Sequence, residues 1–296
     1  MEKKYKLTDE TINVYGRTLY RIEALRDFSD VKKGDKGGFI GNEKNLSHED
    51  NCWVYDDAKV CDEAKVYDNA VVCDNAEVFG NAEVYGKAMV YDNAKIHNHA
   101  SVCGDVRVYG NAKVYDYAEV YGDAKIYGNA VVCENAVVCG YASIYDKAEV
   151  FSYAKVCDYA EVYETARVYG NAKVRGNAMV YGDAVISDNA KVWMDAKVRG
   201  KAKIFDNVRI YDNAKVNGDA VVYGNSEVYN NAEVFGSAEV YGNAMIYGNA
   251  MVCGHAKVCG NAEVYDNGAV YGDGLVYGNA EIYGDREVHG NEKVGE

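Results

Sequence analysis

The chain repeats one six-residue unit along most of its length. Starting at Val54 and stepping by six, each of the 41 positions up to Val294 is Val or Ile, without a gap or an insertion. Ala stands two residues earlier in most units, and Tyr follows the branched residue in 21 of the 41. This period excludes an amphipathic α-helix, whose apolar positions recur about every 3.6 residues. Repetition at a short fixed period is typical of a solenoid.

Each unit predicts a short strand followed by a corner. In Ala112-Lys113-Val114-Tyr115 the alternation places Ala and Val on one face of a strand and Lys and Tyr on the other. Gly or Asp followed by Asn then supplies a corner, because these residues tolerate the backbone angles of tight turns. Proline is absent from the chain, as expected where strand N–H groups are needed for hydrogen-bond ladders. The sequence therefore predicts a single-stranded parallel β-solenoid.

The repeat resembles the hexapeptide repeat of left-handed β-helices, and the resemblance covers residues 52–294. In that superfamily three units form the sides of one triangular coil, which with this repeat takes about 18 residues. The resemblance thus implies an all-β, left-handed triangular β-helix of about 13–14 coils. Left-handedness is implied by the resemblance alone, since crossover connections between parallel strands are generally right-handed.

The N-terminal residues do not follow the period. We expect residues 1–51 to form a cap, with a hairpin around INVYGRTLYRIEAL, and residues 52–296 to form the β-helix. A cap protects strand edges that would otherwise pair with other chains. The segment LRDFSDVKKGDKGGFIGNEKNLS, residues 25–47, is similar to the front end of uncharacterised bacterial and phage hexapeptide proteins that are classed as acyltransferases by their repeat.

Charge and hydropathy narrow the classes of partner. The net charge of −14 disfavours nucleic acid, which is bound by Lys and Arg that neutralise phosphates, and it also disfavours anionic lipid. The first residues, MEKKYKLTDETINVYG, contain no apolar stretch of the kind found in export signals. We therefore expect a cytoplasmic protein that binds neither nucleic acid nor a membrane.

The histidines and cysteines are weak candidates for chemistry. Left-handed β-helix acyltransferases use a histidine near extended loops, and zinc carbonic anhydrases of the same superfamily use three histidines between subunits. No loop interrupts the 41 repeats, so no concave pocket that could enclose a substrate is expected. We expect no catalytic residue, no cofactor and no metal site. This expectation covers the five histidines, the Cys253-His255-Cys259 group and three stacked aspartates, namely His48, His97, His99, His255, His289, Asp56, Asp74 and Asp92.

The outward tyrosines are the strongest candidates for an interaction surface. Stepping by 18 sorts them into columns, of which two are unusually pure. One contains Tyr91, Tyr109, Tyr127, Tyr145, Tyr163 and Tyr181, and the other contains Trp193, Tyr211, Tyr229, Tyr247, Tyr265 and Tyr283. Ring stacking between coils stabilises a solenoid by itself, by roughly 0.2–1 kcal/mol per neighbouring pair. A flat aromatic strip is also typical of protein interfaces.

Three functions remain open on these observations. The leading hypothesis is a non-catalytic, rigid scaffold that binds a protein partner or assembles with itself through the aromatic columns. The first alternative, implied by the resemblance, is an acyltransferase with its site between subunits. The second is an acidic inhibitor or decoy of a host protein, of bacterial or phage origin, whose acidic corners imitate DNA.

Overall fold

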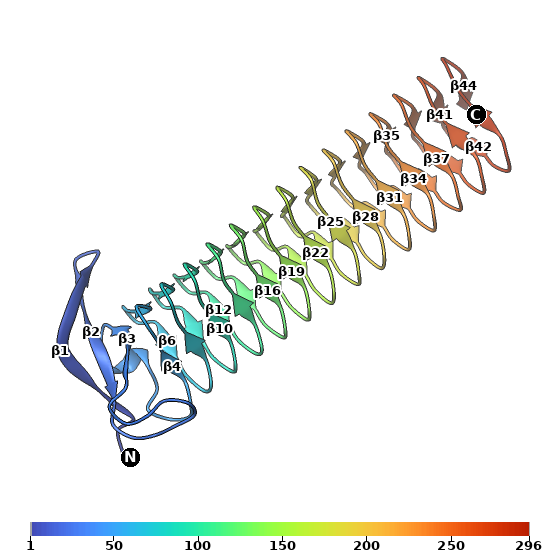
Figure 1. Ribbon diagram of the computed structural model, residues 1–296. Coiled ribbons are helices and arrows are strands. Elements are labelled where there is room, and N and C mark those ends of the chain that lie inside the picture. Colours follow the sequence, from blue (N-terminus) through green and yellow to red (C-terminus); the bar gives the residue numbers. More distant parts are fainter. Residues whose placement is uncertain (1, 296) are drawn as a thin grey trace. The chain divides into compact units, whose positions relative to one another are not determined.

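The computed structural model describes residues 2–295. The chain forms two compact units, Met1–Asp146 and Lys147–Glu296. Apart from one short 3-10 helix, η1 (Glu43–Asn45), the regular elements of the described residues are β-strands. Figure 1 shows the N-terminal hairpin and the successive coils that follow it. No helix among residues 2–295 is long and apolar enough to cross a bilayer.

Each six-residue repeat gives one strand, usually of two residues, and three strands complete a coil of about 18 residues. In unit 1 the three parallel sheets are named after an outward residue of each. The Tyr109 face contains β4 (Trp53–Val54), β7 (Val71–Val72), β10 (Met89–Val90), β13 (Arg107–Val108), β16 (Lys125–Ile126) and β19 (Ser143–Ile144). The His97 face contains β5 (Lys59–Val60), β8 (Glu77–Val78), β11 (Lys95–Ile96), β14 (Lys113–Val114) and β17 (Val131–Val132). The Tyr85 face contains β6 (Lys65–Val66), β9 (Glu83–Val84), β12 (Ser101–Val102), β15 (Glu119–Val120) and β18 (Val137–Val138).

Unit 2 repeats the same three-sided arrangement. Its Tyr223 face contains β20 (Glu149–Val150), β23 (Arg167–Val168), β26 (Val185–Ile186), β29 (Lys203–Ile204), β32 (Val221–Val222), β35 (Glu239–Val240), β38 (Lys257–Val258), β41 (Leu275–Tyr277) and β44 (Lys293–Gly295). Its Trp193 face contains β21 (Lys155–Val156), β24 (Lys173–Val174), β27 (Lys191–Val192), β30 (Arg209–Ile210), β33 (Glu227–Val228), β36 (Met245–Ile246), β39 (Glu263–Val264) and β42 (Glu281–Ile282). Its Tyr181 face contains β22 (Glu161–Val162), β25 (Met179–Val180), β28 (Lys197–Val198), β31 (Lys215–Val216), β34 (Glu233–Val234), β37 (Met251–Val252), β40 (Ala269–Val270) and β43 (Glu287–Val288).

The interior of each unit is built from the repeated Val or Ile and the Ala two residues before it. Val120 of β15 lies in register between Val102 of β12 and Val138 of β18, and all three side chains are 0% exposed. Ala118 is equally buried. Columns of identical small and branched side chains fill the space between the sheets, as the alternation of the repeat predicts.

The corners take the backbone angles that the sequence indicates. The residue after the outward Tyr has positive φ, with +81° at Gly122 and +58° at Asp116. Many of the Asp carboxylates at these corners also accept a hydrogen bond from the backbone N–H of the corner one coil later. Asp92 Oδ2, for example, accepts from the N–H of Gly110 at 2.9 Å. Asp therefore supplies both a tolerated conformation and an extra bond between coils.

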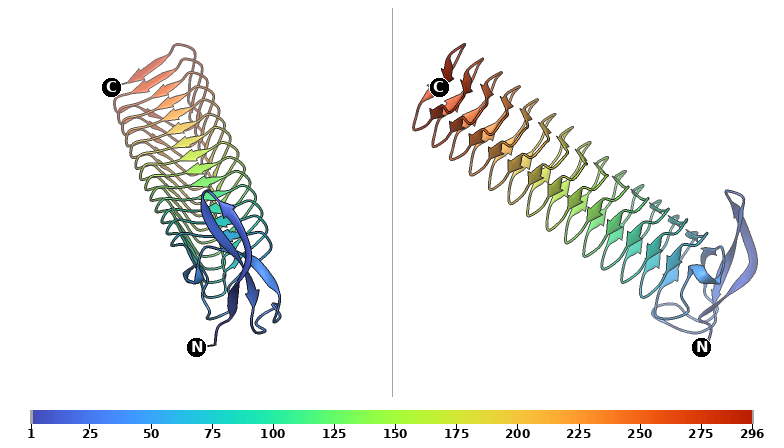
Figure 2. Two further views of the ribbon diagram at one scale, coloured as in Figure 1. Left: turned by 90° about the vertical axis from the view of Figure 1, so that its left-hand side faces the viewer. Right: turned by 180° about the vertical axis from the view of Figure 1, so that it is seen from behind.

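The cap is antiparallel, as expected. β1 (Tyr5–Val14) and β2 (Arg17–Ala24) form a hairpin through Tyr15 and Gly16, whose φ values are +53° and +79°. β3 (Lys36–Ile40) pairs antiparallel with β2 and parallel with β5. Figure 2 shows the hairpin and the first coils of unit 1 from two further sides.

The first coil begins within the cap. Ile40 pairs with Val60 and Leu46 pairs with Val66, so these two residues, six apart, already occupy inward positions. Two additional residues before Val54 break the period at this point. A Cβ on Gly38 would lie 2.6 Å from the Ala58 carbonyl oxygen, which explains the glycine in this tightly packed strand.

A buried lysine fastens the N-terminal strand to the first coil. The Lys4 side chain is 0% exposed, and its ammonium donates to the carbonyl oxygens of Cys52 at 2.8 Å and Glu49 at 3.1 Å. Burial lowers the pKa of Lys4. Nothing in the repeat pointed to this contact, since a lysine near a terminus is normally solvated.

The sequence predictions of fold class are therefore confirmed. The chain is an all-β parallel β-solenoid of about 14 turns with about 18 residues per turn, three parallel sheets and an antiparallel N-terminal cap.

Candidate functional site

The tyrosines that follow the inward residue stack from coil to coil. In unit 1, Tyr91, Tyr109, Tyr127 and Tyr145 form a continuous stack, here called the Tyr109 column, with ring centroids 4.9, 4.9 and 4.8 Å apart. Neighbouring rings are within 3° of parallel. In unit 2, Tyr163 and Tyr181 stack at 4.8 Å and 4°. The structure thus brings the members of the first predicted column together within each unit.

The second predicted column lies wholly on the Trp193 face of unit 2 and is continuous over all six rings. We call it the Trp193 column. Its centroid distances are 4.6 Å for Trp193–Tyr211, 4.9 Å for Tyr211–Tyr229, 4.9 Å for Tyr229–Tyr247, 5.0 Å for Tyr247–Tyr265 and 5.4 Å for Tyr265–Tyr283. These separations are those of offset stacked rings, which attract each other beyond the area that they bury.

Three tyrosine hydroxyl groups of this column, those of Tyr211, Tyr247 and Tyr265, donate hydrogen bonds to glutamates of the next coil. Tyr247 donates to Glu263 Oε2 at 2.8 Å, and Tyr265 donates to Glu281 Oε2 at 2.8 Å. The hydrogen bond to Glu281 is the main cause that raises the pKa of Tyr265 to about 12. Tyr211, Tyr247 and Tyr265 therefore each lie beside a glutamate of the following coil, and an aromatic column and a column of mostly charged residues run side by side.

Stacking determines which part of each ring meets the solvent. The faces of the inner rings contact neighbouring rings, so their edges and hydroxyl groups form the outer surface. The Trp193 end of the stack is covered by Arg175, whose guanidinium carbon lies 5.9 Å from the Trp193 ring centroid. A column of this kind presents partly positive ring edges and polar hydroxyls to a partner, rather than open aromatic faces.

Stacked rings also occur where the columns of the sequence are mixed. On the His97 face, His97 lies between Phe79 and Tyr115, with both centroid distances 4.8 Å. Burial lowers the pKa of His97. A further stack on the Tyr223 face contains Phe205, Tyr223 and Tyr241. A column therefore need not consist only of Tyr and Trp for its rings to stack. The sequence reasoning selected only the two purest columns and missed these mixed stacks, although their members are also 18 residues apart.

The other histidines considered for chemistry are mostly parts of stacks. His99 stacks on Tyr117 at 4.8 Å, His289 on Tyr271 at 5.5 Å, and His48 of the cap on Tyr5 at 4.3 Å. His255 lies at a corner, where its N–H donates to the carbonyl of Gly272. Among residues 2–295, no group of three or more His, Cys, Asp or Glu side chains is arranged to hold a metal ion.

The acidic corner considered for a divalent cation has backbone partners. Asp56 accepts from the N–H of Asp74 at 3.3 Å, and Asp74 accepts from the N–H of Asp92 at 3.1 Å. These carboxylates therefore connect successive coils.

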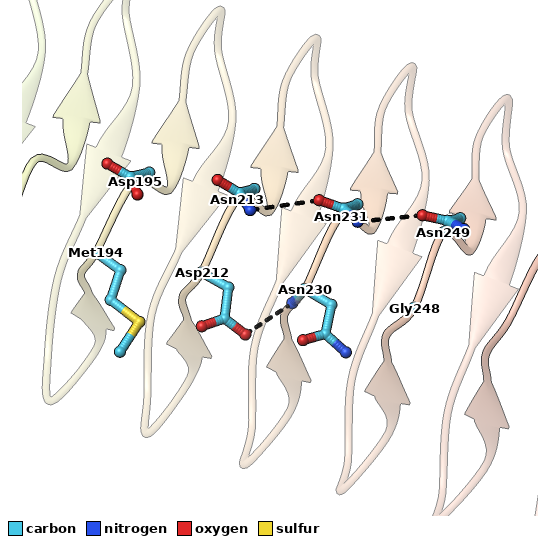
Figure 3. Close-up of a pocket in the computed structure, with 8 residues that line it drawn as sticks. All are labelled: Met194, Asp195, Asp212, Asn213, Asn230, Asn231, Gly248 and Asn249. Carbon is cyan, nitrogen blue, oxygen red and sulfur yellow. Dashed lines mark hydrogen bonds between the residues drawn. The ribbon is translucent and has the colours of Figure 1, made fainter.

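Asparagine side chains form ladders along the corners of unit 2. Asn207 donates to Asn225 at 3.0 Å, Asn225 to Asn243 at 3.0 Å and Asn243 to Asn261 at 2.9 Å. A second ladder lines a shallow hollow, which Figure 3 shows together with Asp212 and Met194. There Asn213 donates to Asn231 and Asn231 donates to Asn249. Because these amides bond to one another, they act as links between coils.

The comparison with known families agrees with this architecture. Residues 124–140, 208–224 and 238–254 each match the model of the YdcK beta solenoid repeat. That description names a repeat and no activity. No curated protein matches the chain. The chain is thus similar in three segments to the YdcK β-solenoid repeat, and its repeat is that of a β-solenoid.

Proposed function

We propose that the protein is a non-catalytic scaffold that binds a protein partner, or a second copy of itself, through its outward aromatic columns. The observation that carries the proposal is the Trp193 column, in which six stacked rings form one uninterrupted strip on a single face. Tyr and Trp are enriched at interfaces because they combine a large apolar area with a polar group.

The stack also lowers the cost of binding. Each inner ring of the column has a neighbour on both sides, and several hydroxyls are held by glutamates, as in Tyr211–Glu227 at 3.1 Å. Side chains that are already ordered lose little conformational entropy when a partner covers them. A regular row of such rings suits a flat partner surface better than a small molecule, which requires a concave site.

Replacing three rings of the column distinguishes the proposed interface from a purely structural role of the rings. We expect the triple replacement of Tyr211, Tyr229 and Tyr247 by Thr to keep the fold, because Thr suits strands. If the column is an interface, light scattering and pull-down experiments will show loss of self-association or of a defined partner. If the rings only stabilise the coil, the melting temperature will fall while every association persists, and the proposal is wrong.

A matched control comes from another face of the same unit. Phe205, Tyr223 and Tyr241 also form a three-ring stack, with centroid distances of 5.2 and 4.9 Å. Their replacement by Thr removes a similar aromatic area but breaks only two ring contacts, whereas the first variant breaks four ring contacts and two hydrogen bonds to glutamates. We expect this control to lose some stability, but less than the first variant, and to retain association.

Acyl transfer is the alternative implied by the resemblance, and it has a separate test. It predicts transfer of an acetyl group from a coenzyme A thioester to an amine or hydroxyl acceptor, and loss of that transfer in His97→Ala or His255→Ala. Such a result would favour the enzyme over the scaffold. We expect no transfer, because no loop leaves the coils of residues 52–295 to enclose the two substrates.

A further inference from the structure

A second outward column runs beside the Trp193 column, formed by the residue that precedes the inward Val or Ile of each strand. In chain order it contains Lys155, Lys173, Lys191, Arg209, Glu227, Met245, Glu263 and Glu281. The first half is thus entirely basic, and the second half contains three acids and one methionine. We call this set the charge column.

The separation of charge within this column is unfavourable for an isolated chain. Like charges on neighbouring strands repel each other across about 4.8 Å. Within residues 2–295, Lys155, Lys173 and Lys191 form no ion pair, and Arg209 pairs only with Glu227, at 2.9 Å. Other columns of residues 52–295 contain at most two basic residues in succession, such as Lys95 and Lys113. Some of them place opposite charges on neighbouring strands, as in Lys65–Glu83 at 3.1 Å. A basic block in a chain of net charge −14 therefore indicates a partner that supplies the opposite charge.

The order of charges is complementary to itself when reversed. A second copy can face the first after a half-turn about an axis that lies in the interface and crosses the columns at right angles. This rotation keeps the charge column opposite the charge column and the Trp193 column opposite the Trp193 column, and it reverses their direction. With the axis midway between Arg209 and Glu227, Lys155 faces Glu281 of the second copy and Lys173 faces Glu263 of the second copy.

The remaining positions also match. Lys191 faces Met245 of the second copy, whose apolar side chain can pack along the lysine stem. Arg209 faces Glu227 of the second copy next to the axis. A parallel arrangement in register would instead place the basic halves of both copies side by side and the acidic halves side by side. The charges thus select the antiparallel orientation, which is the usual effect of charge complementarity at an interface.

The size of the face is sufficient for a weak to moderate dimer. The eight strands β21 to β42 of the Trp193 face extend over about 38 Å at about 4.8 Å per strand, and four residues across a side extend over about 13 Å. One copy therefore offers about 500 Å² of flat contact, and two copies roughly 1,000 Å², at the lower end of specific interfaces. Exposed side chains such as Lys173 and Arg209 increase this area.

We propose that two copies of the chain associate antiparallel and isologously through the Trp193 face of unit 2, with the rings providing contact area and the charge column setting register and direction. This proposal rests on the proposed function, since it names the partner of the same aromatic column as a second copy. It requires each surface to meet the same surface of the other copy, as in a two-fold symmetric dimer.

The test uses two charge-reversed full-length variants. K155E/K173E makes the whole column mainly acidic, and E263K/E281K makes it mainly basic. Each variant alone would place like charges together at four positions of the dimer, so we expect its self-association to be at least about tenfold weaker than that of the wild type in sedimentation velocity. An equimolar mixture restores opposite charges at all four positions. We expect it to form a heterodimer that binds more tightly than either variant alone and somewhat more weakly than the wild type, because E263K/E281K also removes the hydrogen bonds that Tyr247 and Tyr265 donate to these glutamates.

Two further measurements identify the face and the direction. K197E/K203E reverses two exposed lysines on the other two faces of unit 2, and we expect it to dimerise like the wild type. A zero-length carbodiimide cross-link between Lys155 and Glu281 can form only between copies, because within one copy these residues are seven coils, or about 34 Å, apart. We expect this cross-link in the wild type and its loss at high salt.

The outcomes separate this proposal from the proposed function. A wild-type chain that stays monomeric at about 50 μM, or a dimer that persists in both charge variants, overturns the antiparallel dimer. If the Tyr211/Tyr229/Tyr247 variant nevertheless loses a defined partner, the scaffold function stands with another occupant. If neither the charges nor the rings affect any association, both proposals are wrong.

Discussion

The strongest test of the inward column is a carboxylate placed at Val120. This side chain is fully buried between Val102 and Val138, and its strand neighbour Ala118 is also 0% exposed. Val120→Asp removes a buried apolar side chain, which costs about 2 kcal/mol. It also buries a carboxyl group beside apolar neighbours that offer no hydrogen bond, which costs roughly 2–7 kcal/mol even when the group is protonated.

The sum, about 4–9 kcal/mol, is comparable with the whole stability of an ordinary domain. We therefore expect Val120→Asp to unfold at least the central coils of unit 1, seen as loss of the strand signal in circular dichroism and of cooperativity in guanidinium unfolding. Val120→Ile should change stability by less than about 1.5 kcal/mol. Glu119→Asp is the surface control, because Glu119 is the exposed neighbour in the same strand. A Val120→Asp variant whose unfolding curve overlays that of the wild type would refute the inward assignment of the column.

Two further predictions concern the outer surface. Because the pKa of Tyr163 and of Tyr265 is raised to about 12, the unfolded chain ionises first, so we expect stability to be complete below pH 10 and to fall between about pH 10 and 12. Difference absorbance of the wild type against Tyr163→Phe and Tyr265→Phe at alkaline pH checks this, and a pKa near 10 for both residues in the native protein would contradict it. In the corner ladder, Asn225→Ala removes two hydrogen bonds and Asn279→Ala removes one. We expect losses of about 1–2 and about 0.5–1 kcal/mol in guanidinium unfolding, and equal losses would show that the amides act independently of the ladder.

The fold was predictable because several independent features of each six-residue repeat indicate the same structure. The alternation of Ala and Val, the Gly or Asp corner and the absence of proline all indicate a short strand and a turn in each repeat. A misreading of one repeat therefore does not change the predicted fold. The junction with the cap was less predictable. Ile40 and Leu46 are the only two inward residues of the repeat within the cap. The two extra residues before Val54 shift them out of phase with the later repeats, so the sequence alone does not show that they belong to the first coil.

The candidate surface was predictable only in part. The step of one coil identified the rings of the Tyr109 and Trp193 columns, because each outward position is followed by the same position in the next coil. It did not indicate the hydrogen bond from Tyr247 to Glu263, since these residues are 16 apart and meet only because neighbouring columns lie side by side. The partner of a surface depends on a second molecule, and no periodicity within one chain encodes that directly.

The three-sided coil also determines how the chain can change in length without losing its surface. In unit 2, removal or insertion of one whole coil shortens or lengthens a face by one strand and keeps every later column on its original side. A change of a single six-residue repeat keeps the inward Val and Ile in phase but moves every later residue to the next side, a rotation of one third of a turn. Insertions and deletions of whole coils would thus be neutral for binding, whereas those of one or two repeats would redistribute the aromatic and charged columns among the faces.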